Sequence, residues 1–172
     1  DQEKVYVNYI YRSSDSLGLV EHFRKYAESV LSYAAASKGS LVIDVGSNDG
    51  SLLKFFKSNG MKVLGIDPAQ QIAKEANEAG IDTLPKFFSV KLAKEIRREY
   101  GTATVITTNN AFANIDDLQS LVGAVKYLLA PDEIFVFETG YVFDLIQKNI
   151  FDNIYHEHIS YFSVKPLEAF FR

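Results

Sequence analysis

The sequence predicts an α/β fold with a mostly parallel sheet and helices on both of its faces. Short apolar runs rich in β-branched residues alternate with longer stretches whose apolar residues recur at helical spacing. Glycines and polar residues follow the apolar runs directly, as they do where buried strands end in such sheets. Alternation at this pitch indicates parallel strands joined by right-handed crossovers.

Each strand is predicted from one apolar run, and each helix from apolar residues three and four positions apart. The strands are expected at Leu41–Ile43, Val63–Ile66, Ile81–Leu84, Ala103–Thr108 and Glu133–Glu138. The helices are expected at Val20–Ala34, around Leu52–Phe56, and at Ile72–Ala79, Ser89–Tyr100 and Leu118–Leu129. Gly39, Gly80 and Pro131 are predicted to end three of these helices, and another helix is expected after Pro166.

The chain is divided here into a tyrosine-rich leader, residues 1–16, and one domain, residues 17–172. With 172 residues, 47% of them hydrophobic, it can bury a single sizeable core. It begins without an initiator Met and stops within the last expected helix. We therefore expect a fragment of a longer protein whose α/β core is truncated at the C-terminus.

Composition limits the partners and the compartment. The net charge of −4 and the lack of a basic stripe argue against nucleic acid and anionic membrane surfaces. No apolar run approaches the roughly 20 residues of a membrane span, and no signal peptide is visible. The absence of cysteine excludes disulfides and thiolate metal sites within the chain and fits a reducing compartment. A cytoplasmic location is expected.

The most informative segment is Asp44–Gly50, at the end of the first predicted strand. Gly46 and Gly50 allow a sharp turn and a close approach of the backbone to a ligand. The three residues between them can all serve as N-caps of the next helix; they are Ser47, Asn48 and Asp49. Open α/β sheets bind nucleotides at such a turn, although glycines there can also serve packing alone.

The turn favours S-adenosylmethionine over NAD. It lacks the G-x-G-x-x-G fingerprint that binds a pyrophosphate, and its acids Asp44 and Asp49 would repel one. Those carboxylates suit a cofactor with an ammonium, a sulfonium and no phosphate, whose product is S-adenosylhomocysteine. Asp67 ends the next strand about 20 residues on, where an acid can accept hydrogen bonds from ribose hydroxyls.

Further cofactor contacts are predicted at the ends of other strands. Asn109 and Asn110 could bind a polar edge of the cofactor or substrate, or could cap the helix near Asp116. Phe88 could cover an adenine ring or belong to the core. The predicted cofactor-binding residues are Asp44, Gly46, Ser47, Asn48, Gly50, Asp67, Pro68, Phe88, Asn109 and Asn110.

The densest chemistry lies in Tyr155-His156-Glu157-His158. A histidine beside a carboxylate and a phenol can act as a base near neutral pH. A hydrogen-bonded loop without catalytic function is one alternative. A metal site is another, because His156 and His158 would share one side of a strand; it lacks a third ligand, and no metal is predicted. His22 is expected to be a surface or capping residue.

Four segments resemble the S-adenosylmethionine-dependent sugar C-methyltransferases, which alkylate carbon 3 of nucleotide-linked 4-keto deoxysugars. They are Ile43–Leu53, Ile66–Ala69, Thr108–Leu118 and Phe151–Ser163, of which the Tyr-His-Glu-His block is the most specific. The resemblance implies a class I methyltransferase (Rossmann-like) core, between a cysteine-rich zinc-binding module and a second α/β domain. Neither flank is in this chain, so zinc is expected only outside it.

The same resemblance implies roles for individual residues. It makes His158 the catalytic base, assisted by Glu157 and Tyr155, and brings Tyr9 of the leader to the active site. The family often has His where this chain has Asn114, so the resemblance does not fix the substrate. The expected partners are a nucleotide-sugar and the flanking domains of the same polypeptide, which would supply the positive charge that the nucleotide needs.

The predicted reaction is methylation of the carbon next to a ketone. Proton removal there needs a positioned base and a donor that stabilises the enolate oxygen. A histidine with a phenol or amide nearby supplies both, and alignment then directs the carbon to the methyl group. The alternatives are an O- or N-methyltransferase of a small molecule, and a non-catalytic cofactor-binding module, which would have no need of the base.

Overall fold

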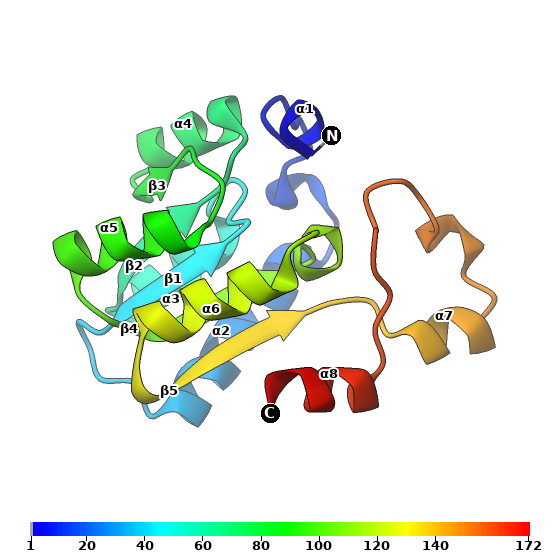
Figure 1. Ribbon diagram of the computed structural model, residues 1–172. Helices are drawn as coiled ribbons and strands as arrows, with labels where there is room; N and C mark the ends of the chain where they lie inside the picture. The colour runs from blue at the N-terminus through cyan, green and yellow to red at the C-terminus, as the bar shows by residue number, and fades with distance from the viewer. Residues whose placement is uncertain (1) are drawn as a thin grey trace.

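A computed structural model describes residues 2–172, and a parallel sheet forms its centre (Figure 1). Within these residues the sheet has five strands in the order β3-β2-β1-β4-β5, and every neighbouring pair is parallel. The strands are β1 (Leu41–Val45), β2 (Lys62–Ile66), β3 (Thr83–Leu84), β4 (Ala103–Asn109) and β5 (Leu129–Glu138). The predicted mostly parallel sheet is confirmed.

Helices cover both faces of the sheet, as predicted. α2 (Leu19–Ala34) and α3 (Ser51–Ser58) pack on one face, and α5 (Val90–Tyr100) and α6 (Leu118–Leu128) pack on the other. α4 (Gln70–Glu78) lies beside β3 and contributes Ala76 to the core on the α2 and α3 side (Figure 1).

The central strand β1 packs against the helices on both faces of the sheet. All five of its residues are buried. Val42 packs toward α2 and α3, whereas Ile43 packs toward α5 and α6, because successive side chains of a strand point to opposite faces. Burying each such side chain contributes about 1.5–3 kcal/mol. The carboxyl end of β1 is thereby fixed in the middle of one sheet edge.

Several predicted helix ends are wrong in detail. α2 ends at Ala34, where Ala35 takes the left-handed conformation and donates to Leu31 O and Ser32 O, so Gly39 lies in the turn beyond. β5 follows α6 at once and contains Pro131, which an edge strand tolerates because one side of its backbone is unpaired. Pro166 lies in the first turn of α8 (Val164–Phe171), where its missing N–H costs nothing.

The N-cap prediction for α3 is also wrong. The cap position is Gly50, at φ +73° and without a side-chain cap, rather than any of the three residues before it. Asp49 still contributes, because its Oδ1 accepts a hydrogen bond from Ser51 N at 3.0 Å. The chain turns too sharply between Gly46 and Gly50 for a side chain at the cap position itself.

The leader and the segment between β5 and α8 lie beyond the carboxyl ends of the strands, whereas α8 runs back along β5 (Figure 1). The leader contains α1 (Gln2–Tyr6) and η1 (Ser13–Asp15). After β5 come α7 (Val142–Gln147), η3 (Phe151–Asn153) and a loop at 154–163 that leads into α8 (Figure 1). The Tyr-His-Glu-His block therefore lies in a loop, and the strand alternation invoked for a metal pair does not apply.

Helix α8 returns to the sheet through aromatic contacts. Phe171 stacks on Phe112 and Phe137, with ring centroids 6.3 and 5.5 Å away. These contacts place α8 against β5. Among residues 2–172, no helix combines the length and apolar character needed to cross a membrane.

Candidate functional site

One cavity of about 760 Å³ opens at the carboxyl ends of β1, β2 and β4. Every predicted site residue lines it except Gly50, which packs against Ile81. Two walls face each other across it. The turn wall consists of Asp44–Asn48, Asp67 and Pro68, and the loop wall of Tyr6, Tyr9, Asn153, Tyr155, Glu157 and His158.

The glycine turn, Gly46–Gly50, is held by backbone hydrogen bonds. Gly46 N and Ser47 N both donate to Ile66 O, at 2.8 and 3.2 Å, which ties the turn to the end of β2. Gly46 has φ +78°, and a Cβ added there would lie 2.8 Å from the Ala111 Cβ. Glycine is therefore required at this position by both conformation and space.

Asp67 supports the turn from the end of β2. Its Oδ2 accepts from Asn48 N at 2.8 Å and its Oδ1 from Ala69 N at 2.9 Å. Burial raises the pKa of this carboxyl above its ordinary value, and the two backbone hydrogen bonds oppose that rise. Each carboxylate oxygen keeps a further lone pair that a ligand hydroxyl could use.

Asp44 is the most deeply buried acid of the turn wall, with 3% of its surface exposed. Burial raises its pKa to about 7, although Thr107 Oγ1 donates a 2.7 Å hydrogen bond to Oδ1 and opposes the shift. A neighbouring cation would favour the ionised form. Near it, Ser47 Oγ is buried and has no hydrogen-bond partner among the described residues. These groups fit the charged end of an S-adenosyl cofactor.

The asparagines after β4 do not cap α6. Asp117 holds the cap position, and its Oδ1 accepts from Ser120 N at 2.9 Å. Asn109 ends β4 with its side chain beside the Tyr26 hydroxyl, and Asn110 N donates to Glu138 O at 2.9 Å. Both asparagines line the cavity. The capping alternative is wrong, because the strand continues through Asn109 before the chain turns.

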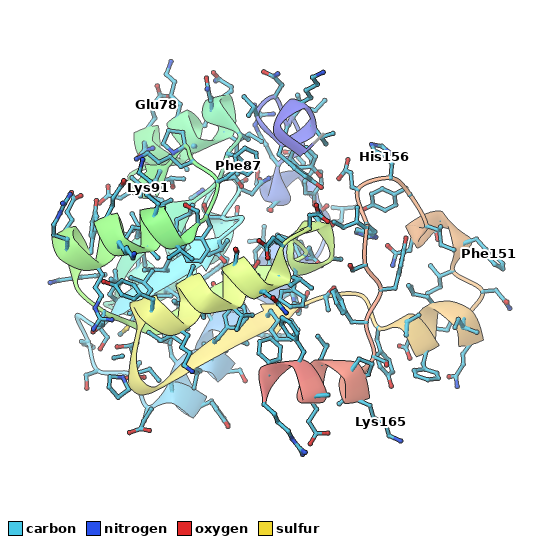
Figure 2. All side chains as sticks on the ribbon, in the orientation of Figure 1. Glu78, Phe87, Lys91, Phe151, His156 and Lys165 are labelled. Atoms are coloured by element: carbon cyan, nitrogen blue, oxygen red, sulfur yellow. The ribbon has the colours of Figure 1, made fainter. Side chains whose placement is uncertain are left out.

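Phe88 combines the two roles considered for it. It packs against the core cluster under α5 and also lines the cavity. Its neighbour Phe87 lines the cavity as well and is 38% exposed (Figure 2). Two aromatic rings are therefore available at this edge of the turn wall.

His158 is oriented by two hydrogen bonds within its own loop. Its Nδ1 lies 3.1 Å from Asn153 O and its Nε2 lies 3.0 Å from the Tyr155 hydroxyl. A carbonyl oxygen can only accept, so the geometry assigns the proton to Nδ1. Nε2 then carries the lone pair and accepts from the Tyr155 hydroxyl, and both residues line the cavity. A neutral histidine held in this tautomer can take up a proton.

Glu157 contacts the leader rather than His158. Its Oε2 accepts a 3.2 Å hydrogen bond from the Tyr9 hydroxyl, across 148 positions of sequence. The histidine ring is therefore oriented by Asn153 O, not by the neighbouring carboxylate as predicted. Burial, together with Glu157, raises the pKa of Tyr9, so this phenol remains a donor at neutral pH. Tyr6 lies nearby, and burial raises its pKa to about 12.

The sequence reasoning missed several residues of the cavity. Asn153 was not singled out, although it directs His158 through its backbone carbonyl, which no sequence pattern reveals. Tyr6 and Tyr11 line the cavity with Tyr9, and their clustering in the leader was a usable signal. His22 lies on α2 and pairs with Glu138 at 2.7 Å, which agrees with its predicted surface position. Among residues 2–172, no group of three or more His, Cys, Asp or Glu side chains could hold a metal ion.

Comparison with known families and structures identifies the domain. A family described as "Methyltransferase domain" matches residues 19–172. The chain belongs to this methyltransferase domain family. Its fold is similar to a SAM-dependent methyltransferase from Archaeoglobus fulgidus, with a TM-score of 0.64 and 16% identity over 88% of this chain and 66% of that one. It is also similar to YcgJ from Bacillus subtilis, at 0.67 and 18% over the same shares.

Two further relatives extend the comparison. The chain is 35% identical to "C-methyltransferase NovU" of Streptomyces niveus over 171 residues, which are 99% of this chain and 41% of that protein. The plantazolicin methyltransferase BpumL, solved with S-adenosylhomocysteine, has a TM-score of 0.59 and 12% identity over 80% of this chain and 52% of its own. The predicted class I methyltransferase fold is confirmed, and the cofactor named for these neighbours agrees with the one predicted for this chain. The chain spans about two fifths of the curated relative.

Proposed function

We propose that the protein transfers a methyl group from S-adenosylmethionine to the carbon next to the keto group of a nucleotide-linked deoxysugar. The observation that carries the proposal is the Tyr155–His158–Asn153 arrangement, which faces the glycine turn across one cavity. Similarity to a relative named as a C-methyltransferase supports carbon as the acceptor. The division into a leader and a domain, and the cytoplasmic location, stay predictions.

The turn wall is proposed to hold the cofactor, which supplies an electrophilic methyl group on a positively charged sulfur. Asp67 would accept hydrogen bonds from the ribose hydroxyls, while Asp44 and Ser47 would face the charged amino-acid end. Further contacts are proposed for the residues that complete this side of the cavity. They are Gly46, the Asn48 backbone, Pro68, Phe88, Asn109 and Asn110, with Gly50 shaping the turn.

His158 is proposed to be the base. As a substrate C–H approaches Nε2, the C–H bond breaks, its proton moves to Nε2, and its electron pair shifts onto the carbonyl oxygen as an enolate. In the imidazolium that forms, the Nδ1–H group keeps its hydrogen bond to Asn153 O. The Tyr155 hydroxyl, no longer needed as a donor to Nε2, can donate to the enolate oxygen. The enolate carbon would then bond to the methyl group while the methyl–sulfur bond breaks and its electron pair stays on sulfur, leaving S-adenosylhomocysteine.

The remaining loop-wall residues would hold the sugar. Tyr9 and Glu157 offer a hydroxyl and a carboxylate to sugar hydroxyls from opposite ends of the chain. Among the described residues, the cavity lining contains five Asp or Glu residues and a single Lys or Arg, which is Lys86. We therefore propose that the nucleotide phosphates lie outside this cavity, against parts of the polypeptide beyond residues 1–172.

The deciding experiment removes the base in the intact protein. His158→Asn should lower methyl transfer to a 4-keto-sugar nucleotide by on the order of 10²–10⁴, the usual effect of losing a positioned acid–base group. Solvent deuterium exchange at the substrate α-carbon should fall in parallel, while S-adenosylhomocysteine affinity remains. Mass spectrometry follows both reactions, and calorimetry follows binding.

His156→Asn is the matched control, because His156 is exposed at the outer edge of the same loop and does not line the cavity (Figure 2). It should retain near wild-type transfer. Wild-type exchange rates in His158→Asn would exclude His158 as the base and point to Tyr155 or Tyr9. Methyl transfer to oxygen or nitrogen, located by NMR of the product, would favour the alternative class of methyltransferase.

A further inference from the structure

We infer that Asn48 is a positioning residue that binds the leader to the glycine turn and thereby holds Tyr9 against Glu157 in the loop wall. This inference rests on the proposed function in one respect, the place of Tyr9 beside the methyl acceptor. The inference also assigns Asn48 a different role from the predicted one. The sequence predicts that Asn48 binds the cofactor, whereas its side chain forms hydrogen bonds to the leader.

Both polar atoms of the Asn48 side chain contact the leader. Its Oδ1 accepts from Ser13 N at 2.9 Å, and its Nδ2 donates to Tyr11 O at 2.9 Å. The second lone pair of Oδ1 accepts from Asp49 N, also at 2.9 Å. Only 8% of the residue is exposed, so these hydrogen bonds face little competition from water. The acceptor capacity of the side chain is therefore filled without a cofactor.

Two further contacts fix the same stretch of the leader. Asp49 Oδ2 accepts from Ser14 N at 3.0 Å. The Arg12 guanidinium forms a bidentate ion pair with Glu75 of α4, at 2.7 and 2.8 Å. The Arg12 and Glu75 side chains are 39% and 31% exposed, whereas Asn48 is 8% exposed. Asn48 is therefore the contact whose loss should release the leader most.

A continuous series of contacts joins the two walls through Asn48. Its backbone N–H donates to Asp67 Oδ2 at 2.8 Å, on the cofactor side. Its side chain holds Tyr11, whose ring makes an edge contact with Tyr9 at 6.3 Å. The Tyr9 hydroxyl then donates to Glu157 on the loop wall. A ligand that rigidifies Asp67 and the turn should therefore slow the opening of the leader.

Asn48→Gly tests the inference without adding strain. Asn48 has φ +50°, a conformation that glycine adopts freely, and the variant keeps the backbone N–H to Asp67. Asn149→Gly is the matched control. Asn149 has φ +52° and is exposed between α7 and η3, far in sequence from the leader.

Amide hydrogen exchange in the intact protein measures directly how often the leader opens. In Asn48→Gly we expect the Ser13 amide to exchange at least tenfold faster than in wild type, and in Asn149→Gly no change. S-adenosylhomocysteine should slow leader exchange in wild type and no longer do so in Asn48→Gly. The affinity of Asn48→Gly for S-adenosylhomocysteine should stay within about threefold of wild type, while its turnover at saturating S-adenosylmethionine falls about tenfold.

Two results would overturn the inference. One is unchanged exchange at Ser13. The other is a loss of S-adenosylhomocysteine affinity above tenfold, which would make Asn48 a cofactor ligand. If Asn48→Gly does not fold, Asn48→Asp keeps the acceptor for Ser13 N but loses the donor to Tyr11 O. It should speed exchange at 11–14, and unchanged exchange there counts against the inference. Failure of the wild type to methylate a keto-sugar refutes the proposed function alone, because exchange is measured without a methyl acceptor.

Discussion

The turn wall and the loop wall of the cavity are stabilised in different ways. In the turn wall, Asp44, Asn48 and Asp67 are each less than 9% exposed, and hydrogen bonds join residues on the adjacent strands β1 and β2. In the loop wall, Tyr155 is 44% exposed, and the hydrogen bond from Tyr9 to Glu157 joins opposite ends of the chain. The first wall is part of the sheet core, whereas the second is assembled on its surface.

This difference suits the two walls to different functions. A buried wall built on strand ends keeps its geometry because any movement would disturb the core. A surface wall of loop and leader can open at little cost, since few buried contacts are lost. A cofactor site belongs on the first kind of wall, and a site that admits a bulky acceptor belongs on the second. The predictions below test this division in order of expected effect.

The largest effect is expected for Asp67→Ala. Losing two charge-assisted hydrogen bonds to ribose hydroxyls, at about 1.5 kcal/mol each, should weaken S-adenosylhomocysteine binding about 100-fold. Calorimetry measures this directly. Asp152→Ala, at an exposed acid of η3, is the control and should bind normally. Tight NADH binding by the wild type without S-adenosylhomocysteine binding would contradict the cofactor assignment.

Gly46→Ala should damage the turn wall through packing as well as conformation. The left-handed backbone costs an added Cβ about 1–2 kcal/mol, and the contact 2.8 Å from Ala111 Cβ adds about 1–3 kcal/mol. Gly39→Ala isolates the first term, because Gly39 has φ +85° and open space around it. Urea unfolding should show Gly46→Ala to be less stable than Gly39→Ala by about 2 kcal/mol. Equal losses of unfolding free energy in the two variants would show that the turn wall shifts to accommodate the added Cβ.

Tyr9→Phe should produce a smaller effect, confined to the loop wall. It removes the donor to Glu157, a hydrogen bond to a charged group that partial exposure weakens to about 1 kcal/mol. We expect a roughly fivefold loss of kcat/KM for the methyl acceptor and unchanged S-adenosylhomocysteine affinity. Tyr33→Phe, on an exposed face of α2, should change neither. A loss of S-adenosylhomocysteine affinity in Tyr9→Phe larger than the loss of kcat/KM for the methyl acceptor would place the Tyr9 hydroxyl in the cofactor site instead.

The smallest effects concern two acids of the turn with opposite pKa shifts. Burial raises the pKa of Asp44 from about 3.8 to about 7, so its contribution to the free energy of unfolding falls as pH rises from 4 to 7. Asp44→Asn should therefore raise Tm by a few degrees at pH 8 and by less at pH 5. A shift that is the same at both pH values would exclude Asp44 as the source.

Asp49 should behave in the opposite way. Burial opposes ionisation, but hydrogen bonds from Ser51 and Ser14 outweigh it and lower the pKa of Asp49. Its stabilising contribution is present above pH 4 and is lost as pH falls through the folded-state pKa. Asp49→Asn should therefore lower Tm equally at pH 8 and pH 5, and by less below pH 4. Thermal unfolding at three pH values measures both variants.

Much of the turn wall could be predicted because its determinants are local. The run before Asp44, the glycines after it and the acid ending the next strand are read within one strand–helix–strand unit. The predicted caps failed in this segment because Gly50, not a polar residue, takes the left-handed cap position. The role of Asn48 could not be predicted, since it depends on backbone groups of the leader that are 35 and 37 positions away. The role of Asn153 could not be predicted because it acts through a backbone carbonyl, which every residue has.

The sequence by itself determined which segments form strands and helices, where the glycine turn lies, and that a histidine stands beside a phenol in one short block. Those properties depend on residue types and spacings that act over a few residues, through burial, turn conformation and charge. Tertiary structure alone decided that Asn153 rather than Glu157 orients His158, and that the leader closes on both the turn and the loop. Such contacts join residues up to 148 positions apart. They form only after the sheet core has fixed where the two ends of the chain can meet.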